Sequence, residues 1–125
     1  MELKEYEEGK LRIIKRLLEN IRAAKAAGDE LRVKKQMEEA LKAVPTLVNV
    51  IKEERRAVAK RLDVRTLLDA QLGLVSKDLK GLAQLYLGLK DLEKLNECYS
   101  QIIKVLEKLS STIGETLALI RKRAA

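Results

Sequence analysis

The chain has 125 residues, of which 36% are charged and 46% hydrophobic, and its formal net charge is +7. This length suits one domain with a single core. Because the sequence has no His and only one Cys, it excludes a His-based catalytic or metal centre and an internal disulfide.

The first predicted helix covers about residues 3–27, where apolar residues recur at steps of three and four. Gly28 suits a left-handed C-terminal cap and Asp29 suits the next N-cap, so a tight reversal is expected there. Helices are also predicted at about 30–62, 64–88 and 91–123.

The second predicted helix contains Pro45, which lacks a backbone N–H and disfavours helical geometry at Val44. We therefore expect a kink or break near Pro45. The helix should end near Leu62, with Asp63 as the N-cap of the third helix. The core spacing of the third helix is carried by Leu68, Leu72, Val75, Leu79, Leu82, Tyr86 and Leu89.

The fourth predicted helix has the longest apolar ladder, from Leu92 to Ile120. Thr116 is its one polar rung, and its hydroxyl can donate to the carbonyl of Thr112. The segment from Thr112 to Glu115 matches a capping box, which leaves a second break near Thr112 as an alternative to the continuous helix that we expect.

Short links force neighbouring helices to run antiparallel. We therefore predict an all-α, single-domain, antiparallel up-down four-helix bundle over residues 1–125, with coiled-coil-like packing. The high charge and the few Cys and Met residues are typical of a heat-stable or engineered protein. A charged amino terminus and a lone Cys98 predict a cytoplasmic location.

Both hairpin turns resemble those of tetratricopeptide repeats. The residues that carry this resemblance are Gly28, Asp29, Ala40, Leu41 and Pro45 in the first hairpin and Leu82, Ala83, Tyr86, Asp91 and Tyr99 in the second. It implies helical hairpins that bind peptides in a concave groove. The two hairpins are 62 residues apart, however, whereas the family repeats every 34.

A basic hairpin of two long helices, followed by the segments 79–82 and 91–95, is similar to the helical core of ESCRT-III proteins. This second resemblance implies that the basic helices lie on anionic membranes and that the subunits polymerise into filaments.

Enzymatic chemistry finds little support in the residue types present. Cys98 lies on the apolar ladder and has no His to activate it. The carboxylate pairs at 7–8, 38–39 and 53–54 are expected mostly on outward positions, with only Glu54 and Asp78 near the helix seams. We therefore predict that the protein is not an enzyme, with no catalytic residues, no cofactor, no metal site and no small-molecule substrate.

Basic residues concentrate in one half of the predicted bundle, where they could neutralise phosphate groups. The candidate polyanion contacts are Arg12, Lys15, Arg16, Lys52, Arg55, Arg56, Lys60, Arg61, Arg65, Arg121, Lys122 and Arg123. Acidic residues share this half, so a solvated surface of mixed ion pairs explains the same pattern.

We expect a non-catalytic helical scaffold or interaction protein that acts through helix–helix association, with itself or with a protein partner. Leu67, Leu74 and Leu85 lie off the main seam of the third helix and would widen its apolar face. One alternative is a basic protein that binds a nucleic-acid backbone or an anionic membrane. Another is a designed bundle without biological activity.

Overall fold

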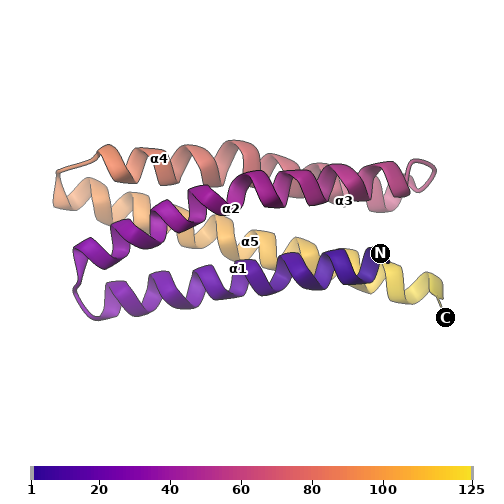
Figure 1. Cartoon of the computed structure of the whole chain (residues 1–125), viewed down its shortest axis with the longest axis horizontal. Coiled ribbons are helices and arrows are strands. Elements are labelled where there is room, and N and C mark those ends of the chain that lie inside the picture. The colour runs from indigo at the N-terminus through magenta and orange to yellow at the C-terminus, as the bar shows by residue number, and fades with distance from the viewer. Residues whose placement is uncertain (1, 125) are drawn as a thin grey trace.

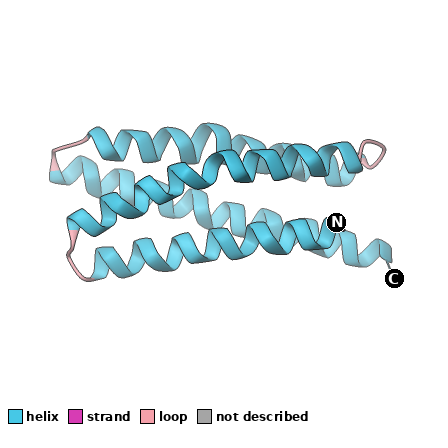
Figure 2. Cartoon of the chain, in the orientation of Figure 1, coloured by secondary structure: helices cyan, strands magenta, loops and turns pink. Residues whose placement is uncertain are grey.

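Four helical segments run antiparallel along one axis, and the computed structural model describes residues 2–124 (Figure 1). They are α1 (Leu3–Ala26), α2 (Glu30–Ala57), a third segment made of α3 (Leu62–Gly73), η1 (Leu74–Leu79) and α4 (Lys80–Gly88), and α5 (Leu92–Ala124). Short links at 27–29, 58–61 and 89–91 join them (Figure 2). This arrangement confirms the predicted all-α up-down four-helix bundle.

The four segments form a square in cross-section. α1 packs on α2 and α5, and the third segment packs on the same two helices, so α1 and the third segment occupy one diagonal. Both termini and the 58–61 link lie at one end of the bundle, which we call the α2–α3 end (Figure 1). The links 27–29 and 89–91 lie at the opposite end, which we call the α1–α2 end.

The first reversal forms as its sequence predicts. Gly28 has φ +66°, a left-handed conformation that glycine adopts without a Cβ clash. The Asp29 side chain then accepts a hydrogen bond from the Arg32 backbone N–H at 3.1 Å and caps α2.

The second reversal differs from the prediction, because α2 ends at Ala57 rather than near Leu62. The link lets Val58 and Val64, on opposite sides of the turn, both bury their side chains in the core. The N-cap of α3 is Arg61, and Asp63 lies inside the first turn, where it accepts from the Val64 N–H at 2.9 Å.

No helix break occurs at Pro45, where a kink or a break was expected, or at Thr112, where a break was the alternative. α2 continues through Pro45 and bends near its middle, as Figure 1 shows. α5 continues through Thr112, whose hydroxyl donates to the Lys108 carbonyl at 2.8 Å instead of capping a new helix. The expected continuity at Thr112 is therefore confirmed.

The third segment contains a feature that its sequence spacing did not predict, the π-helical stretch η1 at Leu74–Leu79. Each π-turn holds about one residue more than an α-turn, so the phase of the buried face shifts along the segment. The shift buries Ala83 instead of the expected Leu82, which is half-buried, and still places Tyr86 in the core.

Candidate functional site

The end of α2 and the start of α3 form a shallow hollow that we call the basic hollow. Its volume is about 340 Å³, and its lining residues are Lys52, Arg55, Arg56, Ala59 and Arg65. Four of these five residues are cationic and none is acidic, so the hollow favours anions.

Ion pairs and one backbone contact hold the arginines of the basic hollow in place. Arg55 Nε lies 2.9 Å from Asp69, and Arg56 Nη1 lies 2.8 Å from Glu53. The Arg65 guanidinium donates to the Ala59 carbonyl at 3.3 Å. Lys52 is exposed and makes no ion pair within the described chain, so its charge is available to a ligand.

The remaining predicted polyanion contacts are scattered. Lys60 and Arg61 lie beside the hollow in the 58–61 link, and Arg61 is 3.7 Å from Asp63. Arg16 lines a different hollow between α1 and α2, with Lys35 and Glu39. Those two residues precede Lys52 on α2 by at least 13 positions, or roughly 20 Å at 1.5 Å per residue.

The predicted contacts on α5 also lie apart from the basic hollow. Lys122 lines a hollow between α3 and α5, and Arg121 is exposed near it. On α1, Arg12 and Lys15 are exposed. The side chain of Arg123 lies outside the described residues.

A buried polar cluster crosses the core near the α2–α3 end, and most of it was not predicted from the sequence. Each helical segment contributes to it, and its fully buried members are Glu7, Lys10, Glu54, Gln71 and Thr116. The expectation that Glu7 faces outward was therefore wrong. The sequence did contain a signal for their burial, because Glu7 and Lys10 precede the core residue Ile14 by seven and four positions and so lie on the same face of the helix.

Lys10 lies at the centre of this cluster. Its Nζ is 2.6 Å from Glu7 Oε1 and 2.5 Å from Glu54 Oε1, and it also donates to Gln71 Oε1. Three oxygens from three helices thus surround one buried ammonium group, which suits its three N–H donors.

Gln71 connects the cluster to α5. Its Nε2 donates to Glu7 Oε2 at 3.2 Å and to Thr116 Oγ1 at 3.1 Å. The Thr116 hydroxyl donates in turn to the Thr112 carbonyl at 2.9 Å, which confirms the bond predicted from the sequence.

Glu54 is the least satisfied member. Its Oε1 has the ion-pair contact with Lys10, but neither carboxyl oxygen makes a hydrogen bond of regular geometry. Burial and the neighbouring Glu7 carboxyl raise the pKa of Glu54 to about 9, although Lys10 acts in the opposite direction. Glu54 therefore favours its neutral, protonated form.

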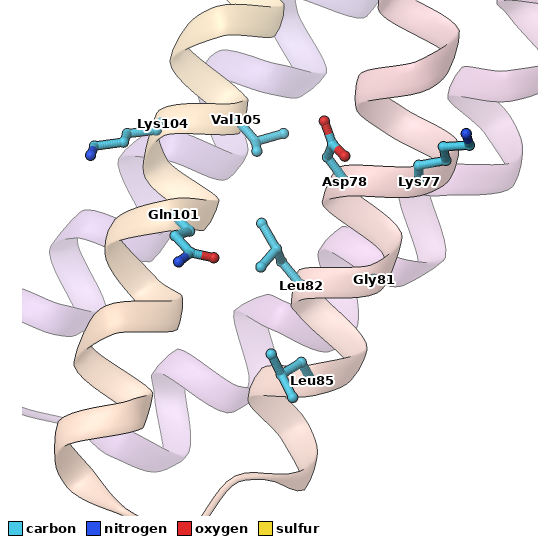
Figure 3. A pocket seen from close by; sticks show the side chains of 8 residues that line it. All are labelled: Lys77, Asp78, Gly81, Leu82, Leu85, Gln101, Lys104 and Val105. Carbon is cyan, nitrogen blue, oxygen red and sulfur yellow. The ribbon is translucent and has the colours of Figure 1, made fainter.

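An apolar groove, the second candidate site, lies between the third segment and α5 (Figure 3). Its volume is about 500 Å³, and Leu82, Leu85 and Val105 project into it. Asp78 and Lys104 lie at its rim, and Leu85 is 52% exposed. A further hollow of about 560 Å³, lined in part by Leu67, extends along the same two segments toward the α2–α3 end.

The three leucines predicted to widen this face have different outcomes. Leu74 is buried, Leu67 is half-buried and Leu85 is exposed above the groove. These leucines therefore contribute partly to the core and partly to an apolar surface that is open to solvent.

Cys98 is a core residue. Its thiol donates to the Leu82 carbonyl at 3.3 Å, and burial raises its pKa. A raised pKa lowers the thiolate fraction, so the thiol is a poor nucleophile at neutral pH.

Within residues 2–124, no three His, Cys, Asp or Glu side chains are grouped so that they could hold a metal ion. None of the described helices is long and apolar enough to cross a membrane. Comparisons with family models, curated proteins and solved structures found no match for this chain.

Proposed function

We propose that the protein is a non-catalytic helical scaffold that docks an amphipathic partner helix in the apolar groove. The observation that carries this proposal is Leu85, which is 52% exposed above a groove floored by Leu82 and Val105. A half-exposed leucine over an apolar floor is the type of surface that receives an apolar side chain of another helix.

The dimensions of the face support helix docking. The apolar side chains that line the groove and the further hollow run from Leu67 to Leu85 along the third segment, a length of roughly 27 Å at 1.5 Å per residue. This length suits about five turns of a partner helix. The rim carries both signs of charge, with Lys77 and Asp78 on one side and Lys104 on the other.

The test uses Nile red, a neutral dye, and a labelled helical peptide with leucine at every third or fourth position and Gln or Ala elsewhere. Leu85→Glu should weaken binding of both probes at least about tenfold, because it places a charge over the groove floor. Leu92→Glu is the matched control, since Leu92 is 67% exposed and does not line the groove. A wild-type protein that binds neither Nile red nor the helical peptide would contradict the proposal.

A second candidate function is polyanion binding at the basic hollow. The observation that favours it is the lining of the hollow, which has four cationic residues and no acid. Binding of this kind depends on salt, because it releases counterions from the polyanion.

The triple variant Lys52→Glu, Arg56→Glu, Lys60→Glu tests this function on heparin and on duplex DNA. The three side chains are exposed, so their reversal leaves the core unchanged. We expect retention on both matrices to be lost. The control reverses Arg32, Lys35 and Lys94 at the α1–α2 end and should retain binding, whereas equal loss in both variants would show that only net charge matters.

A further inference from the structure

We propose that the α2–α3 end docks on a bilayer that contains anionic lipid, with Leu62 inserted among the headgroups. This inference rests on the second candidate function and assigns its anions to lipid headgroups. It joins two observations at one corner of the bundle, a cationic hollow and an exposed leucine beside it.

Leu62 is the first residue of α3 and is 73% exposed. It follows directly on the 58–61 link, in which Ala59 and Lys60 are also exposed. A large aliphatic side chain at the tip of a bundle gains nothing from packing in the isolated chain. It gains free energy when it leaves water for the headgroup and acyl boundary of a membrane.

The charges around Leu62 are arranged to hold this tip against an anionic surface. Lys60 and Arg61 precede it, and Arg65 follows it by almost one helical turn. Each Lys or Arg held near an anionic bilayer strengthens binding by roughly fivefold.

The acids of this corner already have cationic partners. Glu53 pairs with Arg56 at 2.8 Å, and Asp69 pairs with Arg55 at 2.9 Å. Asp63 lies 3.7 Å from Arg61. Lys52 and Lys60 are exposed and make no ion pair with any described residue, so they remain available to lipid phosphate and carboxylate groups.

The acidic residues at the start of α1 determine how the bundle is oriented on the membrane. Glu2 and Glu5 are exposed at the same end of the bundle, but α1 packs on α2 and α5 and reaches α3 only through the buried side chains of Glu7, Lys10 and Gln71. The contact therefore involves the α2–α3 corner, and the bundle axis tilts so that the start of α1 points away from the membrane.

A nucleic acid would use the same cations but has no use for an aliphatic tip. A phosphate backbone presents charged oxygens and sugars, and Leu62 would stay in water beside it. The dependence of binding on Leu62 thus separates a membrane from a nucleic acid.

The absence of Trp from the chain allows a direct insertion experiment. Leu62→Trp places a single reporter at the tip, and Leu31→Trp places one at the α1–α2 end, where Leu31 is 82% exposed. The probes are vesicles of phosphatidylcholine alone and of phosphatidylcholine with about 30% phosphatidylserine, which gives the surface the negative potential that basic residues recognise. We expect the indole emission of the Leu62→Trp variant to shift to the blue with the anionic vesicles only, and that of the Leu31→Trp variant to stay unshifted.

Affinity measurements by vesicle co-sedimentation complete the test. Leu62→Gln should weaken binding to the anionic vesicles at least about fivefold and leave retention on heparin unchanged. Leu31→Gln should leave both unchanged. The triple variant Lys52→Glu, Arg56→Glu, Lys60→Glu should lose both.

The outcomes distinguish this inference from the function on which it rests. Wild-type binding to heparin or DNA without vesicle binding would overturn the membrane inference alone. Vesicle binding that Leu62→Gln leaves intact would do the same, as would a vesicle-bound Leu62→Trp variant whose emission does not shift. A wild-type protein that binds neither heparin nor DNA nor the anionic vesicles would overturn both.

Discussion

Lys10 Nζ of α1 and Glu54 Oε1 of α2 lie 2.5 Å apart in the core, where both side chains are fully buried. Such a pair contributes less to stability than its short distance suggests, because both groups lose their hydration. Removal of the Lys10 ammonium group is far more costly, since it leaves the buried Glu7 and Glu54 carboxyls without a cation.

Lys10→Met is therefore expected to lower the free energy of unfolding by about 3–5 kcal/mol. The variant leaves the Glu7 and Glu54 carboxyls together without a cation. Urea denaturation measures the change, and Lys15→Met, an exposed position on the same helix, should alter stability by less than about 0.5 kcal/mol. A similar small effect for both variants would show that the cluster is not closely packed around Lys10.

Stability should fall as pH rises through the neutral range, because the pKa of Glu54 is raised from 4.5 to about 9 on folding. The contribution of the Glu54 proton to the free energy of unfolding is complete below pH 4.5. It declines above that, since the unfolded chain releases the proton while the folded chain retains it, and it is lost once pH passes about 9. The slope is at most about 1.4 kcal/mol per pH unit.

Glu54→Gln should remove this slope and leave the variant more stable than the wild type at pH 8, because a neutral amide replaces a group that resists ionisation. Denaturation curves at pH 5, 7 and 9 measure it. Glu53→Gln, at an exposed position, should keep the wild-type slope. A slope that persists in Glu54→Gln would assign the proton to another group.

Two glycine-to-alanine variants should have opposite effects. Gly28 has φ +66°, so a Cβ there is strained, and Gly28→Ala should cost about 1 kcal/mol. An added Cβ at Gly114 in α5 meets nothing within 4 Å, so Gly114→Ala should stabilise by up to about 1 kcal/mol. Thermal melts of the two variants on either side of the wild type would confirm this, and shifts of the same sign would contradict it.

Deletion of Ser76 should be tolerated. Ser76 is exposed within η1, and removal of one residue converts a π-turn into an α-turn without rotating the helices on either side. Deletion of Ser111, exposed in α5, should instead rotate the rest of that helix by about 100° and expose its core face. Thermal melts followed by circular dichroism compare the two deletions. Equal destabilisation would show that η1 does not hold one residue more than an α-helix of the same length.

The fold was predictable because its determinants are local. Apolar spacing locates the helices, and Gly28 with Asp29 defines the first reversal. The end of α2 was misplaced by about five residues, because the turn depends on the burial of Val58 and Val64 against the other helices. No local signal distinguishes that turn from one more turn of helix.

The sites were less predictable, for two physical reasons. Glu7, Lys10 and Gln71 look like surface residues by type, and only their combination with Glu54 across three helices lets them be buried. The basic hollow needs the true end of α2, since that turn brings Arg65 beside Lys52. The resemblances to tetratricopeptide repeats and ESCRT-III proteins stay predictions.

Docking of a helix in the apolar groove is tested most directly by hydrogen exchange of the whole chain with and without the leucine-rich helical peptide. We predict slower exchange confined to the segments that line the groove and the further hollow, at 63–85 and 101–122. Slower exchange in α1 or α2, or no change in exchange at saturating peptide, would contradict helix docking in the groove.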